Sequence, residues 1–453
     1  MEVIDQLVIP PSVNHIMLLK YILTIALLLF LPYLCMVMGA SFLSVYFNSK
    51  GRRSGNALYS RFAKDVIERL TITKNAELAL GIIPVLSITF SYAQLLYEAK
   101  TIVIGILALS AVIFITAFIF IYKYRSTFKV KSIITAAKSL MNPKSLNSKG
   151  KAAEEINEFE DSLVKVSRNS GKAGVLLLYT AAYLFVGSTV LAVDYYRWPE
   201  INNILALLFS WTTFSNFFYL IAASGTITGG AILFYFYQWQ GGIKDMDEVY
   251  SKFVKKFAGG LAFISALTLP LLLFYNFIYL PQVALSGSVF VYMVLALVVI
   301  LLLCNFLYWV IKNSDVKFAA LVFVMIFLVF TFNIIKDQIA FGNAIREQTL
   351  FIISKAEELE TEKKLKVTTA GGMTGEQLYN LKCVSCHKFD IRLVGPPHNV
   401  VVPKYGGDIK KLAAYLLSPP KIDPNYPPMP NPGLKPKEAA AVAEYLIKKV
   451  SGK

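Results

Sequence analysis

Long apolar runs alternate with short polar segments through most of the chain. Eight of these runs are about 20 residues or longer, the length that crosses the hydrocarbon core of a bilayer. The pattern therefore predicts an all-α polytopic membrane domain over residues 1–340. The runs cover residues 16–47, 77–97, 101–122, 173–194, 204–238, 257–280, 286–311 and 317–336.

The connecting segments differ in charge, and this difference predicts how the helices are oriented. Lys and Arg gather in alternate segments, and by the positive-inside rule these basic segments are cytoplasmic. Both chain ends then lie outside. The basic segments are 48–76, 123–172, 239–256 and 312–317, whereas 98–100, 195–203 and 281–285 carry almost no positive charge.

The 123–172 segment is the long cytoplasmic loop of this arrangement. It reads as a basic stretch followed by an acidic helix, which predicts a solvated helix pair near anionic lipid headgroups. A docking site for a cytoplasmic partner is the alternative. In the fifth run, Gly225, Gly229 and Gly230 would allow a neighbouring helix to approach closely.

Composition supports the membrane assignment. Hydrophobic residues make up 56% of the chain and charged residues 16%, whereas soluble domains are about 45–50% apolar. The net charge of +16 is accounted for by the basic loops, so it does not indicate nucleic-acid binding. Glu2 and Asp5 precede a first run that is too long for a signal peptide, so we expect that run to be retained as a span.

The chain becomes polar after the last apolar run. Glu and Lys alternate between Ser354 and Gly372, which predicts a charged helical linker over 341–372 supported by pairs four residues apart. Residues 368–372 should form a short flexible joint.

Residues 383–387 read Cys-Val-Ser-Cys-His, and this motif carries the strongest chemistry in the sequence. Cys-x-x-Cys-His is the attachment site of c-type haem, in which Cys383 and Cys386 add to the haem vinyl groups and His387 ligates the iron. A thioredoxin-like pair would need a βαβ context, and a zinc site would need a second pair of ligands. The sequence offers neither, so we expect one covalent haem c.

Residues 373–453 resemble a small class I cytochrome c across their whole length, with helices expected at 374–382, 407–418 and 435–450. The resemblance implies that the Pro396 carbonyl orients His387 and that Met429, in a proline-rich loop, is the sixth iron ligand. His398 reads as a surface-loop histidine, with a bis-histidine haem as the alternative.

Positive charge also gathers around the haem motif in the sequence. Such a field could steer an acidic redox partner, or serve only solubility. The residues concerned are Lys382, Lys388, Arg392, Lys404, Lys410 and Lys411.

The layout of the spans resembles subunit I of the cytochrome bd quinol oxidases over roughly 15–280, through His15 at the first helix, a glycine near the second, and the small residues of the fifth. That family has a haem-ligating histidine on the fifth helix, where this chain reads Phe214–Phe218. Because the spans hold no histidine beyond His15, haem b is disfavoured, although ligation through His15, or through Met and Glu, stays open. Glu77 and Glu98 could line a proton or quinone site.

These features predict an eight-helix transmembrane bundle followed by a small periplasmic class I cytochrome c domain, in a multi-pass protein of the bacterial inner membrane. We expect an electron-transfer subunit of a respiratory complex rather than a catalytic subunit by itself. Its partners would be other membrane subunits, a periplasmic redox protein and the lipid bilayer, and a quinone would be a further cofactor. The alternatives are a bd-like quinol-oxidising or oxygen-reducing subunit fused to cytochrome c, and a redox sensor acting through the 123–172 loop.

Overall fold

The structure is a computed structural model that describes residues 10–71, 74–140, 151–201, 203–244, 246–313, 315–370 and 373–451. Within these residues every regular element is a helix, which confirms the all-α prediction. The backbone divides into two compact units, Met1–Ile353 and Ser354–Lys453.

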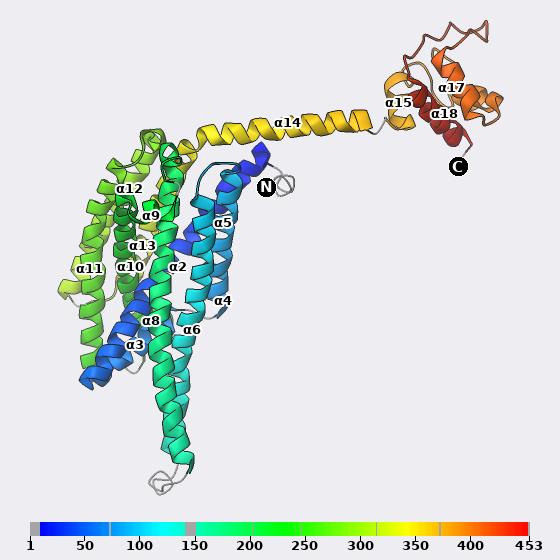
Figure 1. Ribbon diagram of the computed structural model, residues 1–453. Helices are drawn as coiled ribbons and strands as arrows, with labels where there is room; N and C mark the ends of the chain where they lie inside the picture. Colours follow the sequence, from blue (N-terminus) through cyan, green and yellow to red (C-terminus); the bar gives the residue numbers. More distant parts are fainter. Residues whose placement is uncertain are drawn as a thin grey trace. The chain divides into compact units, whose positions relative to one another are not determined.

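The first unit contains the eight predicted spans. Each predicted apolar run overlaps one of the eight helices that, within the described residues, are long and apolar enough to cross a membrane. Most of them stand side by side as a bundle (Figure 1). The spans are formed by α2 (Val13–Ser54), α4, η1 and α5 (Lys74–Glu77, Leu78–Ile82 and Ile83–Leu95), α6 (Val103–Leu140), α8 (Lys151–Val193), α10 (Trp211–Tyr237), α11 (Glu248–Ile278), α12 (Gly287–Asn313) and α13 (Ala319–Ala344).

The fifth run is not one helix, so the prediction of a single element over 204–238 is wrong. A short helix, α9 (Ile204–Leu208), precedes α10. The Asn203 side chain caps α9 by accepting from the Ala206 backbone N–H at 2.9 Å. Ser210 is extended and precedes α10 as its N-cap residue, a position that serine favours. The predicted run is therefore divided into two helices at Phe209 and Ser210.

The predicted cytoplasmic loop 123–172 is largely helical, as expected. α6 continues to Leu140, α8 begins at Lys151, and the two helices run side by side (Figure 1). The Lys138 ammonium joins them by pairing with the Glu160 carboxylate at 2.5 Å. The helix pair is thus confirmed, whereas its proximity to lipid and its docking role stay predictions.

Small residues let α10 and α11 approach closely, as predicted for the fifth run. A Cβ atom at Gly229 would lie 2.6 Å from the Ala258 carbonyl oxygen and 2.8 Å from the Ala262 Cβ on α11. Close approach of this kind is how membrane helices associate, because lipid removes most of the hydrophobic driving force between them.

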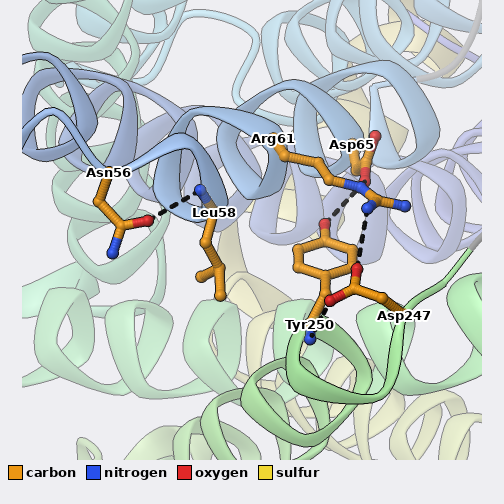
Figure 2. A network of polar contacts seen from close by, with 6 residues as sticks. All are labelled: Asn56, Leu58, Arg61, Asp65, Asp247 and Tyr250. Atoms are coloured by element: carbon orange, nitrogen blue, oxygen red, sulfur yellow. Dashed lines mark hydrogen bonds and ion pairs between the residues drawn. The ribbon is translucent and has the colours of Figure 1, made fainter.

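A polar network joins the first basic segment to the start of α11 (Figure 2). On α3 (Ala57–Leu70), Asp65 accepts a hydrogen bond from the Tyr250 hydroxyl at 2.7 Å. Arg61 pairs with Asp247 at 3.0 Å, and its guanidinium lies 4.4 Å from the centre of the Tyr250 ring. Burial raises the pKa of Asp65. Two segments far apart in the sequence are therefore fixed to each other at one end of the bundle.

The second unit is a small helical domain preceded by a polar helix. α14 continues as helix to Ala370, so the predicted joint is wrong for residues 368–370, while residues 371–372 lie outside the described part. The polar helix is α14 (Arg346–Ala370), whose first residues belong to the first unit. The helices that follow it are α15 (Gly375–Lys382), α16 (His398–Val401), η5 (Val402–Tyr405), α17 (Ile409–Leu417) and α18 (Pro436–Val450).

The three helices predicted for this domain are α15, α17 and α18, and local sequence explains where they begin. Thr374 and Gln377 form a reciprocal capping box at α15. The Asp408 carboxylate caps α17, and Pro436 occupies the first turn of α18. Their apolar faces share one core, whose members include Leu378, Tyr379, Leu412, Leu416, Val442 and Leu446.

We expect Gly229→Ala to lower the stability of the membrane unit by about 1–3 kcal/mol, because the added methyl group meets backbone that cannot move without shifting α11. Gly260→Ala on α11 is the matched control, since no atom lies within 4 Å of its added Cβ. Thermal unfolding of the full chain in detergent measures both. Equal melting temperatures for the two variants would show that the helices do not pack as described.

Candidate functional site

One cavity in the second unit collects the residues that the sequence predicts to hold haem c. It has a volume of about 450 Å³. The five predicted site residues all line it, although they come from three separate segments of the chain. These residues are Cys383, Cys386, His387, Pro396 and Met429.

The end of α15 places the two thiols and the imidazole. Cys383 caps the helix by donating its N–H to the Tyr379 carbonyl at 2.9 Å. The Cys386 and His387 N–H groups then both donate to the Cys383 carbonyl, at 3.1 and 2.9 Å. This tight turn brings the three side chains to one wall of the cavity.

The thiols do not resemble a redox pair or a metal site. Burial raises the pKa of Cys383, whereas reactive cysteines have a lowered pKa. Throughout the described residues, no group of three or more His, Cys, Asp or Glu side chains is arranged to hold a metal ion. The zinc alternative therefore lacks ligands.

The His387 ring is held by a backbone carbonyl. Its Nδ1 lies 3.0 Å from the Pro396 oxygen. Because a carbonyl only accepts, Nδ1 carries the proton and Nε2 keeps its lone pair, which is the form that ligates a metal. A Cβ atom at Gly395 would lie 2.6 Å from either nitrogen of the ring, so only glycine leaves room for the imidazole there.

His398 is buried, so its prediction as a surface-loop histidine is wrong. It is 7% exposed, and its ring stacks on His387 with ring centres 4.9 Å apart and planes 23° apart. Rings this close leave no room for a porphyrin iron between them, which disfavours the bis-histidine alternative. Burial, with His387 beside it, lowers the pKa of His398 to about 4. At neutral pH it is a neutral packing partner of His387.

An irregular loop between α17 and α18 supplies Met429, which is half-buried at the cavity wall. The Arg392 guanidinium lies 4.5 Å from the centre of the Tyr426 ring and donates to the Asn425 carbonyl at 3.3 Å. The Asn431 side chain donates to the Leu417 carbonyl at 3.0 Å. These contacts tie both ends of the loop to the rest of the domain.

Comparison with known proteins agrees with this geometry. Residues 373–448 match the family model described as Cytochrome c. Cytochrome c-551 of Pseudomonas denitrificans is 37% identical over 78 residues, which are 16% of this chain and 95% of that protein. Cytochrome c-551 of Azotobacter vinelandii is 36% identical over 78 residues, with the same coverage.

The chain belongs to the cytochrome c family. The matched region is its C-terminal domain, and no solved structure matches the chain. Membership implies electron transfer and covalently bound haem c.

The residues present fit that cofactor. The thiols of Cys383 and Cys386 lie at one wall, as the two thioether bonds to a c-type haem require. The His387 imidazole and the Met429 thioether line the same cavity and could both ligate the iron. The remaining lining includes apolar side chains, among them Val394, Leu412 and Leu416.

Other residues singled out from the sequence lie elsewhere. His15 is exposed in the first turn of α2. Glu77 ends α4 and Glu98 follows α5, so the two glutamates lie at opposite ends of the second span and do not form one site. The sequence did not predict that Gly395 leaves room for the His387 ring, that His398 stacks on that ring, or that Arg392 contacts Tyr426. Only the Gly-Pro-Pro triplet could have drawn attention to Gly395.

We expect Gly395→Ala to push the His387 ring away from the Pro396 carbonyl, because the new methyl group overlaps the imidazole. The cytochrome c domain should then contain less haem, and its spectrum should show less of the low-spin form. Absorption spectra of purified chain, normalised to protein, measure this. Leu393→Ala, two residues away and exposed, is the control. Equal haem content and equal spectra for both variants would contradict the proposed placement of the ring.

Proposed function

We propose that this protein is a membrane-bound c-type cytochrome subunit of a respiratory electron-transfer complex. It passes single electrons between a membrane complex, or a quinol-linked partner, and an acceptor in the periplasm. The observation that carries the proposal is the convergence of Cys383, Cys386, His387 and Met429 on one cavity of a cytochrome c domain.

Each site residue has a distinct part in this proposal. Cys383 and Cys386 hold one haem c through thioether bonds. His387 and Met429 would ligate the iron, and the Pro396 carbonyl fixes the orientation of His387. The haem supplies one-electron chemistry when bound, and a thioether ligand favours its ferrous state relative to a second nitrogen ligand.

The domain contributes rigidity and exclusion of water around the cofactor. Tyr379 and His398 are buried beside His387, with Phe389 packed against them. Such packing holds the imidazole in one orientation in both oxidation states. Lys382 and Lys404 line the cavity and are exposed, so they are placed to attract an acidic redox partner.

The membrane domain, assigned to residues 1–340, anchors the cytochrome and docks the other membrane subunits. The charged linker covers 341–372 and the monohaem domain 373–453. The positive-inside rule puts both chain ends outside the bacterial inner membrane, and hence the haem in the periplasm. This side is also where c-type haem is attached.

Kinship of the membrane domain with cytochrome bd subunit I stays a proposal that rests on the span layout. A bd-like subunit that oxidises quinol or reduces oxygen is the alternative function, and His15 is the one residue that would carry over. The sequence agrees better with a subunit that serves as a scaffold than with one that reduces oxygen, because Phe214–Phe218 contains no histidine to ligate haem. A quinone bound by the membrane domain would be an additional cofactor, if the electrons come from a quinol-linked partner and not from another membrane complex.

We expect Met429→His to lower the reduction potential of the purified chain, because two nitrogen ligands favour ferric iron. Met429→Ala should abolish the charge-transfer band of methionine-ligated ferric haem and let the ferrous protein bind carbon monoxide. Met373→Ala is the matched control, since Met373 precedes the haem motif and does not line the cavity. Redox titration and absorption spectra make both measurements. If Met429→Ala retains the band and Met373→Ala loses it, the assigned sixth ligand is wrong.

A further inference from the structure

A second cavity lies inside the membrane unit. Its volume is about 160 Å³, and six helices contribute to its wall: α2, α5, α8, α10, α11 and α13. It sits where α8 and α11 end and α10 begins, which by the loop charges is the outer side of the membrane. Apolar side chains make up just over half of the lining and polar side chains the rest, a mixture that suits an organic ligand with polar substituents.

The polar groups on α13 are the unusual feature of this cavity. Lys336 lies in a membrane-spanning helix and is only 4% exposed, which is unusual for a lysine. Its Nζ pairs with the Asp337 carboxylate at 2.9 Å, and the same carboxylate accepts from the Asn333 Nδ2 at 3.1 Å. Buried ionisable groups in membrane helices are costly and usually mark function.

The Asn333 carbonyl oxygen is the group that remains unsatisfied. Oδ1 is buried and has no hydrogen-bond partner among the described residues. Buried polar atoms are nearly always paired, so an orphaned acceptor on the wall of a cavity calls for a donor that the protein does not supply. The Lys336 ammonium already pairs with Asp337, and because an ammonium has three N–H donors it can also donate to an acceptor on the same ligand.

We propose that this cavity binds the headgroup of a membrane quinol. One hydroxyl of the ring donates to Asn333 Oδ1, another ring oxygen accepts from Lys336, and the apolar lining contacts the ring. The small volume admits the headgroup alone and leaves the isoprenoid tail outside in the lipid. The inference rests on the proposed electron-transfer function, and it makes a quinol the source of the electrons.

The polar groups favour a quinol over a phospholipid headgroup. A phospholipid would bring a phosphate anion close to the Asp337 carboxylate, which disfavours it, whereas a hydroquinone is neutral. A hydroquinone both donates and accepts. Neither Glu77 nor Glu98 lines this cavity. The quinol site proposed here is therefore a different one from the proton or quinone site suggested at those two residues.

Binding of a short-chain quinol tests the site directly. Decylubiquinol is titrated into the full chain in nanodiscs, with the haem kept ferrous so that no electron is transferred, and binding of oxidised decylubiquinone is measured for comparison. We expect the wild type to bind the quinol at least tenfold more tightly than the quinone, because only the quinol donates to Asn333. Asn333→Leu should abolish that preference, and Lys336→Met should weaken both ligands at least tenfold.

Asn305→Leu on α12 is the control, because Asn305 is exposed and its Nδ2 bonds to the Leu301 carbonyl within its own helix. It should bind like the wild type, and all variants must keep the wild-type melting temperature and haem content to be compared.

For variants that meet this condition, wild-type binding by Asn333→Leu and Lys336→Met overturns the inference, as does displacement of the quinol by phosphatidylglycerol. If haem c is present and redox-active but no quinol binds, the inference fails while the electron-transfer role stands. Absence of haem c removes that role instead.

Discussion

The contact between His387 Nδ1 and the Pro396 carbonyl governs the redox site. It decides which ring nitrogen carries the proton, and it turns the other nitrogen into the cavity. Glycine at 395 leaves the space for the ring, and the buried His398 supports its face. The hydrogen bond, the missing side chain and the stacked ring thus act together on one imidazole. An iron ligand held this firmly would keep its geometry through one-electron oxidation and reduction.

A different constraint shapes the membrane unit. Lipid cannot hydrogen-bond to backbone, so each span satisfies its own polar groups as a helix, and neighbouring helices associate through small residues such as Gly229. Against this apolar background a buried Lys336 and an orphaned Asn333 oxygen stand out as groups that packing alone does not explain. We regard the cavity they line as the place where the membrane unit contributes chemistry and not only anchorage.

The sequence predicted much of this because the strongest signals are local. Apolar runs of span length need no tertiary information, and neither does Cys383-Val384-Ser385-Cys386-His387. What it missed depends on contacts between distant segments or on capping. The fifth run breaks just before α10, where Ser210 is the N-cap residue, and His398 is buried because Tyr379 and Phe389 pack against it. The role of Lys336 was missed for the same reason, since it lies at the edge of an apolar run that gives no sign of burial.

The haem content of the purified full-length protein tests the account most directly. An alkaline pyridine spectrum, with protein quantified in the same sample, gives the type and number of haems per chain. The account predicts a c-type band alone, with one haem per chain that stays attached after acid–acetone extraction. Substituting Cys383 and Cys386 by Ala should remove that covalent attachment. A b- or d-type band from the wild-type protein, or the absence of covalent haem, would contradict the account.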